Sequence, residues 1–540
     1  MKKWLIQLFV LFFSFGFSQQ DQPKLVVGII VDQMRYDYLY RYYDDYSEDG
    51  FKKLLNEGFS FQNTHFNYKP TNTAPGHASV YTGAVPSVHG IIGNYWYHKG
   101  ENQNVYCTTD LNYMSVGLDD ENKEGRMSPG RLKTTTVTDE LKMFSNQRSK
   151  VIGISLKDRG AILPVGHFAD AAYWMDENGK FISSTFYQDN LPAWVENYNA
   201  QNNAQKFINQ GWNLLRPMST YDESIEDNNR YERIFEPKTT PTFPYDLKSI
   251  ADFQGNSEIL KSSPYGNEMV ADLSKLAIKN EELGQGEFTD FLAVSFSAPD
   301  YIGHNFGPRS IEIQDTYIRL DLTMANFIAF LDENVGKGNY LIFLTADHAA
   351  ADNPNHLSDL GYKVRNVNRN DMRDELAEYI RETFGEDVFL NYSNQNIYLN
   401  EELIESQNMN YEQIVDSIRK YVLSKSHVAR VYTRENVLNG NPADAHLTRI
   451  SQGFDPKQNG DLVILLDPQY MEYYETGTTH GSTYMYDTHV PNLWYGWKIK
   501  HGSTPAKKVI TQIAPTLSQL LNISTPNGSE GEVMTELFEE

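Results

Sequence analysis

The sequence has one cysteine, few basic residues and one long apolar run. The single cysteine, Cys107, excludes an internal disulfide and a cysteine-rich metal site, so we interpret it as structural. The chain has 47 Lys and Arg against 71 Asp and Glu, a formal net charge of −24, and no basic run. Nucleic acids and anionic membranes require clustered Lys and Arg, so neither is expected as a partner. An anionic substrate would need strong local positive charge.

The one long apolar run lies near the N-terminus, from Trp4 to about Phe17, after two lysines. This run is shorter than the roughly 20 residues that cross a bilayer, and small residues follow it, which is typical of a secretory signal peptide. We therefore predict a signal peptide over residues 1–18 and a mature chain, 19–540, that is periplasmic or secreted. No cysteine stands at the expected cleavage site, so no membrane anchor is expected.

Five short runs rich in Val, Ile, Leu and Phe are typical of buried parallel strands. These runs are Leu25–Val31, Val151–Ser155, Phe291–Phe296, Tyr340–Thr345 and Leu462–Leu466. Segments with helical periodicity lie between them, such as Ile311–Leu331 and Val509–Leu521. This alternation predicts an α/β fold with a mainly parallel sheet. Two polar stretches rich in Asn, Asp and Tyr, at about 170–280 and 355–460, are interpreted as insertions into a single domain.

Residues of metal-ligand type follow three of the predicted strands. They are Asp32, Asp300 with His304, and Asp347 with His348, and His480 adds a further imidazole in a Thr-His-Gly turn. A single aspartate at a strand end is usually a helix cap, but ligands of α/β proteins bind beyond the carboxyl ends of the strands. Three carboxylates and three imidazoles without a thiolate favour two zinc ions over magnesium or calcium. Manganese and iron also fit these ligand types.

The segment from Thr71 to Ser79, TNTAPGHAS, is typical of a turn that enters a helix, with Pro75 in the first turn. Thr73 would then lie at the helix N-terminus. Free backbone amides and the helix dipole there favour an anionic nucleophile and an incoming phosphoryl group. An N-cap threonine is the simpler interpretation of this segment taken alone. A zinc-bound hydroxyl, however, can ionise near neutral pH and become a strong nucleophile.

At these residues the chain resembles the alkaline phosphatase superfamily, and within it the flavobacterial phosphate-irrepressible alkaline phosphatases that use a threonine nucleophile. The resemblance extends over nearly the whole mature chain and is carried, in order, by NTAPGHAS, HGIIGNYWY, SLKDRG, APDYIGH, TADH and THGSTYMYDTHVP. It implies an alkaline phosphatase-like sandwich, with a central mostly parallel sheet flanked by helices. It also implies one zinc ion held by Asp300, His304 and His480, and a second held by Asp32, Asp347, His348 and the Thr73 oxygen.

The same resemblance assigns a phosphoryl oxygen to Asn94 and the remaining substrate charge to Lys157 and Arg159. Two zinc ions, three aspartates, an ionised Thr73 and this Lys–Arg pair sum to two positive charges, which match a dianionic monoester better than a monoanionic diester. We therefore expect an alkaline phosphatase that cleaves small phosphorylated metabolites through a covalent phosphothreonine. The alternatives are a phosphodiesterase or nucleotide pyrophosphatase of the same superfamily, in which Lys157 and Arg159 would be a surface pair, and a non-catalytic binder.

One position departs from the pattern of the family. Classical bacterial alkaline phosphatases have a glutamate that helps to bind magnesium five residues before the Asp300 position, and here that residue is Ser295. This argues against a third, magnesium, site, and Lys157 is expected to supply part of its charge. The remaining histidines near these motifs are interpreted as structural, or as outer contacts of the ligands, because the ligand sets are complete without them: His77, His89, His98 and His489. A monomer is expected from the flavobacterial relatives.

Overall fold

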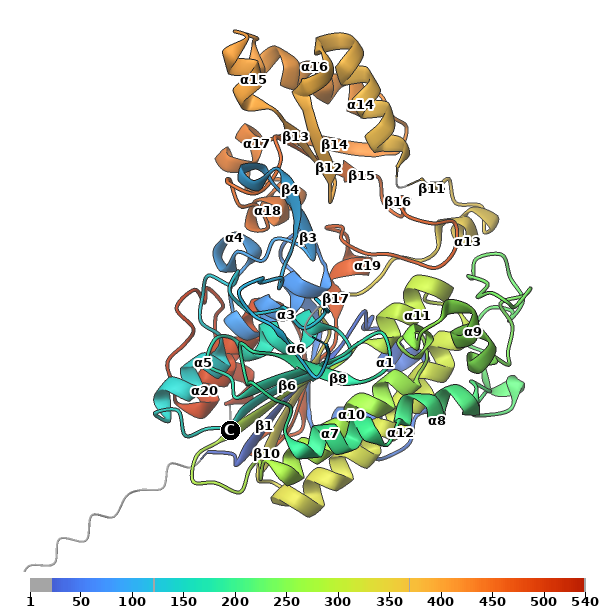
Figure 1. Cartoon of the computed structure of the whole chain (residues 1–540), viewed down its shortest axis with the longest axis vertical. Coiled ribbons are helices and arrows are strands. Elements are labelled where there is room, and N and C mark those ends of the chain that lie inside the picture. The colour runs from blue at the N-terminus through green and yellow to red at the C-terminus, as the bar shows by residue number, and fades with distance from the viewer. Residues whose placement is uncertain (1–21, 120–121, 369, 539–540) are drawn as a thin grey trace, which may run out of the picture.

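The computed structural model describes residues 22–119, 122–368 and 370–538. The predicted signal peptide, residues 1–18, lies outside the described residues. Figure 1 shows a large α/β body with a smaller lobe above it. Within the described ranges, no helix is both long enough and apolar enough to span a bilayer.

An 11-stranded sheet forms the centre of the body. Its middle consists of parallel strands in the order β10-β1-β9-β6-β7, and mostly antiparallel strands extend both edges. The parallel strands are β1 (Leu25–Val31), β6 (Val151–Ser155), β7 (Ala171–Met175), β9 (Asp290–Phe296) and β10 (Tyr340–Thr345). Every residue of β1, β9 and β10 is buried, as expected of strands that are covered on both faces. The predicted α/β fold with a mainly parallel sheet is confirmed.

The strands that extend this sheet come from both halves of the chain. They are β2 (Phe59–His65), β5 (Ser115–Val116), β8 (Phe181–Ser184), β17 (His489–Val490), β18 (Asn492–Gly496) and β19 (Gly502–Val509). Two groups of helices cover the two faces (Figure 1). One group is α3 (Thr73–Thr82), α5 (Val137–Phe144), α6 (Asp158–Val165) and α20 (Ile513–Leu521). The other is α10 (Tyr265–Asn280), α11 (Ala298–Phe306) and α12 (Ile311–Leu331).

The small lobe, drawn in orange at the top of Figure 1, has its own sheet and its own hydrophobic core. Its antiparallel sheet has the order β12-β13-β15-β14, and helices pack against it. The elements are β12 (Phe389–Ser393), β13 (Asn396–Leu399), β14 (Val428–Thr433), β15 (Leu462–Leu466), α14 (Asp371–Phe384) and α16 (Tyr411–Leu423). The chain enters and leaves the lobe through β11 (Asn366–Val367) and β16 (Met471–Glu472), which pair with each other.

A hairpin of the body, β3 (Tyr95–His98) and β4 (Gln103–Tyr106), reaches up to the lobe (Figure 1). Lys99 in its turn forms ion pairs with Glu401 at 2.7 Å and Asp461 at 2.9 Å. The other helices are short: α1 (Tyr38–Arg41), α2 (Phe51–Glu57), α4 (Pro86–His89), α7 (Ala193–Ala200), α8 (Asn203–Gln210), α9 (Leu247–Gln254), α13 (Pro354–Asp359), α15 (Glu401–Ser406), α17 (Arg434–Asn439), α18 (Ala445–Gln452) and α19 (Met485–Thr488).

One predicted strand belongs to a different sheet from the one expected. Leu462–Leu466 was expected in the buried parallel sheet, but β15 pairs antiparallel with β13 and β14 in the small lobe. Its alternate residues enter two clusters, with Leu462 and Ile464 in the core under the lobe helices and Val463 and Leu465 in a second cluster on the opposite face. A strand buried on both faces has an unbroken apolar sequence in either kind of sheet, which explains the error.

Candidate active site

Most of the predicted metal ligands lie at the carboxyl ends of three neighbouring strands of the main sheet. Asp32 follows β1 directly, Asp347 and His348 follow β10, and β9 leads into α11, which carries Asp300 and His304. β9 and β10 are the two neighbours of β1, and all three run parallel, so their carboxyl ends lie side by side. His480 joins these strand ends from the loop that follows β16.

The structure gathers these six residues into two groups of three. One group is Asp300, His304 and His480, and the other is Asp32, Asp347 and His348. Within each group, one ligand atom of every residue lies within 4.8 Å of the others. The imidazole rings of His348 and His480 stack with centroids 3.4 Å apart, so the two groups are adjacent. The groups have the same members as the two ligand sets that the family resemblance implied.

A backbone carbonyl orients each of the three imidazoles through its Nδ1 atom. The contacts are His304 to Thr478 at 2.7 Å, His480 to Thr71 at 2.6 Å and His348 to Ala349 at 3.0 Å. A ring that donates from Nδ1 keeps its lone pair on Nε2. Each Nε2 atom lies 3.2 to 3.6 Å from a carboxylate oxygen of its own group. This tautomer and this orientation are those of histidines that bind a metal ion.

In the second group, one buried atom of each residue lacks a hydrogen-bond partner among the described residues. Asp32 Oδ1, Asp347 Oδ2 and His348 Nε2 have no partner among the described residues. Burial raises the pKa of Asp32 to about 6 and the pKa of Asp347 well above its ordinary value, and burial lowers the pKa of His348. Buried acceptors of this kind are costly unless a cation or a donor reaches them. A divalent metal ion would satisfy all three, and mixed nitrogen and oxygen ligands suit zinc.

Lys157 lies between the two groups and contacts a carboxylate of each. Its Nζ atom is 2.7 Å from Asp32 Oδ2 and 2.5 Å from Asp300 Oδ2. Burial lowers the pKa of Lys157, but the two carboxylates outweigh burial and raise it above its ordinary value. Burial likewise raises the pKa of Asp300, but His304 and Lys157 outweigh it and hold this pKa well below the usual range. Lys157 is buried, so it is not part of a surface pair.

Arg159 extends from the first turn of α6 and has an uncharged hydrogen-bond partner. Its Nη1 atom donates to the Tyr106 hydroxyl at 2.9 Å, and that hydroxyl donates to Asp158 at 2.7 Å. The Nε atom of Arg159 is buried without a partner among the described residues. A guanidinium that is held in place but not neutralised by an ion pair can bind an incoming phosphoryl group through charge-assisted hydrogen bonds.

Thr73 is the first residue of α3 and is almost fully buried. The N-cap position is occupied by Asn72, so Thr73 is not the N-cap residue. Asn94 accepts a hydrogen bond on Oδ1 from the Ala74 amide at 2.8 Å, which holds its side chain at the helix N-terminus. Gly76 lies in the next turn, where a Cβ atom would stand 2.2 Å from the Asp347 carbonyl oxygen. The start of α3 therefore packs directly against the strand end that carries the second ligand group.

Gln33 belongs to this site and was missed in the sequence. It follows Asp32 with a positive φ of 65°, and its side chain is buried. Its Nε2 atom donates to Asp300 Oδ1 at 2.6 Å, and its backbone amide donates to Asp347 Oδ1 at 3.2 Å. Gln33 thus connects the carboxylates of both groups. An uncharged glutamine is not a residue of metal-ligand type, and its position directly after Asp32 was the one available signal.

Replacing Gln33 by alanine is expected to weaken zinc binding by about 10- to 100-fold, because outer hydrogen bonds keep ligand carboxylates in position. The measurement is a zinc titration of chelator-treated protein, in which calorimetry and the recovery of hydrolysis report zinc binding. Gln205→Ala is a matched control because Gln205 is exposed on α8. Unchanged zinc affinity in Gln33→Ala would show that Gln33 does not position the ligands.

Of the remaining histidines, His77 contacts the site directly. Its Nδ1 atom lies 3.4 Å from Asp347 Oδ2 and 2.9 Å from the Thr73 carbonyl oxygen, and its Nε2 atom lies 2.9 Å from Ser295 Oγ. Cys107 is buried and unpaired. The other three histidines contact neutral groups or cap a turn: His89 lies beside Ser79, His98 caps a short helical turn and His489 contacts the Gln62 carbonyl. Among the residues that the structure describes, no third group of metal-ligand type accompanies Ser295.

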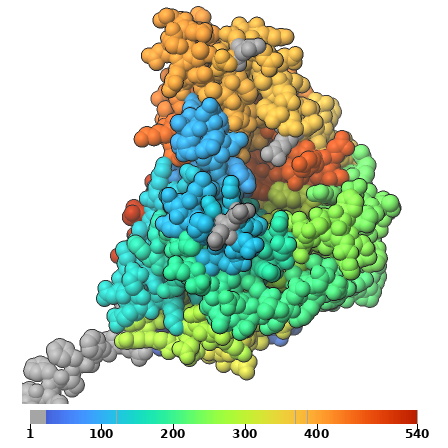
Figure 2. Space-filling model, in the orientation of Figure 1, coloured from blue at the N-terminus to red at the C-terminus, as the bar shows by residue number. Residues whose placement is uncertain are grey.

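The site opens into a cleft of about 770 Å³ between the body and the small lobe. Figure 2 shows the surface hollowed at this boundary. Asn94, His304 and His480 line the cleft from the body. Amides and tyrosines from the lobe side line it as well: Asn391, Tyr392, Asn394, Gln395 and Tyr470. Tyr473 lies beside His304, with ring centroids 5.5 Å apart. Substrate would therefore reach the metal ligands between the two parts of the chain.

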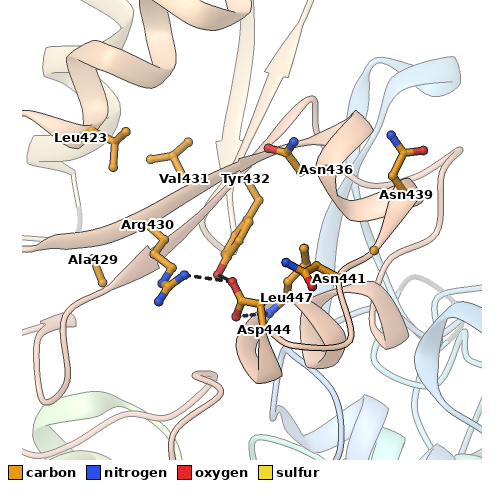
Figure 3. A pocket seen from close by; sticks show the side chains of 11 residues that line it. Leu423, Ala429, Arg430, Val431, Tyr432, Asn436, Asn439, Asn441, Asp444 and Leu447 are labelled. Carbon is orange, nitrogen blue, oxygen red and sulfur yellow. Dashed lines mark hydrogen bonds and ion pairs between the residues drawn. The ribbon is translucent and has the colours of Figure 1, made fainter.

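A second hollow, of about 490 Å³, lies on the small lobe and contains none of the predicted site residues (Figure 3). Arg430 and Asp444 pair with each other across it at 3.0 Å, and the Tyr432 hydroxyl donates to Asp444 at 2.9 Å. Arg430 and Asp444, the charged residues that line this hollow, therefore neutralise one another.

Comparisons with known proteins agree with this geometry. A family model described as type I phosphodiesterase/nucleotide pyrophosphatase matches residues 26–492. A protein of Myroides odoratus named calcium-transporting ATPase is 44% identical, with both chains covered over 100% of their length. Alkaline phosphatase PafA of Elizabethkingia meningoseptica is 41% identical over 99% of both chains, and alkaline phosphatase PhoV of Synechococcus elongatus is 42% identical over 100% of both.

Two solved structures have a fold similar to that of this chain. The crystal structure of PafA superposes with a TM-score of 0.92 at 40% identity and covers 96% of this chain and 99% of its own. Phosphonoacetate hydrolase of Sinorhizobium meliloti shares the fold with a TM-score of 0.51 at 15% identity. The family model and the full-length relatives together show that the chain belongs to the type I phosphodiesterase/nucleotide pyrophosphatase family of the alkaline phosphatase superfamily.

Proposed function

We propose that this protein is an alkaline phosphatase that hydrolyses phosphate monoesters, with Thr73 as the nucleophile and two zinc ions as cofactors. The observation that carries the proposal is the position of Lys157, which contacts a carboxylate of each ligand group, together with the unneutralised Arg159 nearby. Two full-length relatives named alkaline phosphatases support the same reaction. A solved variant of PafA, in which a threonine, an asparagine, a lysine and an arginine are substituted, supports the choice of residue types.

The charges of the site favour a monoester over a diester. A monoester brings two negative charges at alkaline pH, and a diester brings one. Lys157 contacts Asp32 and Asp300, which zinc ions would bind, so Lys157 together with Arg159 would supply the positive charge for the additional phosphoryl oxygen. In a site that is partly shielded from water, an unmatched charge is costly, so a diester would bind less well.

Asp300, His304 and His480 would hold one zinc ion, and Asp32, Asp347 and His348 would hold the other beside Thr73. Zinc bound by these groups would lower the pKa of a hydroxyl and stabilise negative charge on phosphoryl and leaving oxygens. Thr73 Oγ1 gives its proton to solvent and attacks phosphorus in line with the leaving oxygen. A Thr73 oxygen–phosphorus bond forms, the bond from phosphorus to the alcohol oxygen breaks, and that oxygen takes a proton from water. Asn94, Lys157 and Arg159 hold the phosphoryl oxygens during this transfer.

Water then completes the reaction. It attacks phosphorus of the phosphothreonine from the side that the alcohol vacated, the Thr73 oxygen–phosphorus bond breaks, and inorganic phosphate leaves. Each step inverts the configuration at phosphorus, so the two steps together retain it. The hydroxyl of Thr73 regains its proton, and the enzyme returns to its starting state.

The proposal is tested by comparing a chromogenic phosphate monoester with the diester of the same alcohol, using zinc-loaded protein. Replacing Arg159 by alanine is expected to lower kcat/KM for the monoester by about 10- to 100-fold and to affect the diester less, because a charge-assisted hydrogen bond is lost. Arg148→Ala is a matched control because Arg148 precedes the amino end of β6, whereas the site lies at the carboxyl ends of the strands. A wild-type preference for the diester would assign the protein to the phosphodiesterase alternative.

The relative named calcium-transporting ATPase does not point to different chemistry at this site. ATP ends in a terminal phosphoryl group with two ionisable oxygens, which the same residues can bind and transfer to Thr73 and then to water. We therefore include nucleoside triphosphates among the small phosphorylated metabolites proposed as substrates. We further propose that the mature chain, 19–540, acts as a monomer in the periplasm or outside the cell.

A further inference from the structure

Lys69 is a buried lysine that the proposed mechanism does not use. It is 6% exposed and lines the cleft. Its Nζ atom has two long contacts, both with uncharged oxygens, at 3.3 Å from Gln395 Oε1 and 3.4 Å from the Ile464 carbonyl. Among the described residues, no carboxylate forms an ion pair with it. A buried ammonium in such surroundings is costly, and burial lowers the pKa of Lys69 to about 8.

The acid that is electrostatically nearest to Lys69 is Glu472, and its carboxylate is engaged elsewhere. The Tyr392 hydroxyl donates to Glu472 Oε1 at 2.6 Å, and Gln395 Nε2 donates to Oε2 at 3.0 Å. Because Gln395 accepts from Lys69 through its other amide atom, it separates the two charges. The N–H donors of the Lys69 ammonium therefore have, among the described residues, acceptors that are uncharged and 3.3 to 3.4 Å away.

The position of Lys69 relates it to the reacting end of the substrate. Lys69, Pro70 and Asn72 line the same cleft as Asn94, His304 and His480. Four residues of chain lead from Lys69 to Thr73, so their Cα atoms are at most about 14 Å apart. The lysine side chain itself reaches several ångströms. A substrate that contacts both residues would therefore carry its second polar group a few carbon atoms from the phosphoryl group.

We propose that Lys69 binds a second anionic group on the alcohol part of the substrate, so that the preferred monoesters carry a carboxylate or a second phosphate. The inference rests on the proposed phosphatase function and deepens it by naming a substrate class. An anion at this point would supply the charged acceptor that the buried ammonium lacks, and the neutral amides and tyrosines of the cleft would receive the intervening carbons and hydroxyls. Lys69 would then determine specificity without taking part in phosphoryl transfer.

The test is made at pH 7, below the pKa of about 8 at which Lys69 loses its proton. It compares glycerol 3-phosphate with 3-phosphoglycerate, which differ in the replacement of a hydroxymethyl group by a carboxylate. The wild type is expected to show the higher kcat/KM with 3-phosphoglycerate. Lys69→Met is expected to lower that value by about 10- to 100-fold and to change kcat/KM for glycerol 3-phosphate by less than about 3-fold, since one charge-assisted contact is lost. Lys69→Arg, which keeps the charge, is expected to retain most of the preference.

Lys99→Met is the matched control, because Lys99 also joins the body to the small lobe but does not line the cleft. The ratio of its kcat/KM values for the two substrates is expected to equal that of the wild type. If Lys69→Met lowers kcat/KM for both substrates by the same factor, Lys69 acts through the attachment of the lobe and the inference is wrong. Should Lys69→Met fail to fold, Lys69→Gln is measured in its place. If wild-type protein hydrolyses neither monoester, the proposed function itself fails.

Discussion

Replacing Thr73 by alanine is expected to lower kcat/KM for a phosphate monoester by about 10⁴-fold or more, because loss of a nucleophile removes the covalent route altogether. Thr73 is the first residue of α3, whose next residue, Ala74, donates its amide to Asn94 and whose Gly76 packs against the Asp347 backbone. Alanine is compatible with this first helical position, and Asn72 remains the N-cap residue. The melting temperature of the variant should therefore stay close to that of the wild type.

The matching measurement is acid quenching of wild-type protein with a phosphorus-labelled monoester during steady-state turnover. Label is expected on the wild type and on Thr73→Ser, which keeps a hydroxyl, and not on Thr73→Ala. Thr73→Ser should retain measurable hydrolysis, since serine can attack phosphorus in the same way. Rapid hydrolysis by a correctly folded Thr73→Ala would contradict the role of Thr73 and would favour direct attack by water.

Removing metal with a chelator is expected to lower monoester hydrolysis by at least about 10³-fold, and added zinc is expected to restore it. Two groups of three potential ligands adjoin one another, and in one of them the buried atoms Asp32 Oδ1, Asp347 Oδ2 and His348 Nε2 find no hydrogen-bond partner in the described part of the chain. The protein ligands of such a site must also bear the cost of their own burial when no cation is bound. Magnesium alone should restore little, because imidazoles are poor ligands for it.

The same treatment tests stability separately from activity. Metal that binds the folded state alone adds to the free energy of unfolding, so zinc-loaded protein should melt at a higher temperature than chelated protein. His348→Ala removes one ligand of the Asp32 group and should lose much of this zinc-dependent gain. His356→Ala is a suitable control because His356 lies on α13, outside both ligand groups. Equal melting temperatures with and without zinc would count against a zinc site in this structure.

The parts of the fold that were predictable are those in which local sequence and burial agree. β1, β9 and β10 are continuous apolar runs buried along their whole length, and polar residues follow each of them. β15 has the same kind of sequence, but it belongs to the small lobe. An apolar run reports that both faces are covered and does not report which strand lies alongside it, so the pairing partner of β15 could not be read from its composition.

The candidate site divides in the same way. Its charged residues were recognised because carboxylates, imidazoles and a hydroxyl are the residue types that zinc and phosphoryl chemistry require. Gln33 was missed because its contribution depends on a left-handed backbone conformation that turns an uncharged amide toward Asp300. The unusual position of Lys69 was also invisible, since a lysine in a sequence carries no sign of its burial.

The sequence by itself determined which residues can ligate, attack and bind charge, because these properties belong to individual side chains and their order along the chain. It also determined the family resemblance and the net negative charge. The tertiary structure alone decided that the ligands form two adjacent groups, that Lys157 lies between them while Arg159 stays free of an ion pair, and that a small lobe closes the cleft with Lys69 in its wall. These features depend on the distances between residues that are remote in sequence, and the parallel order of β10, β1 and β9 sets those distances by bringing separate strand ends together.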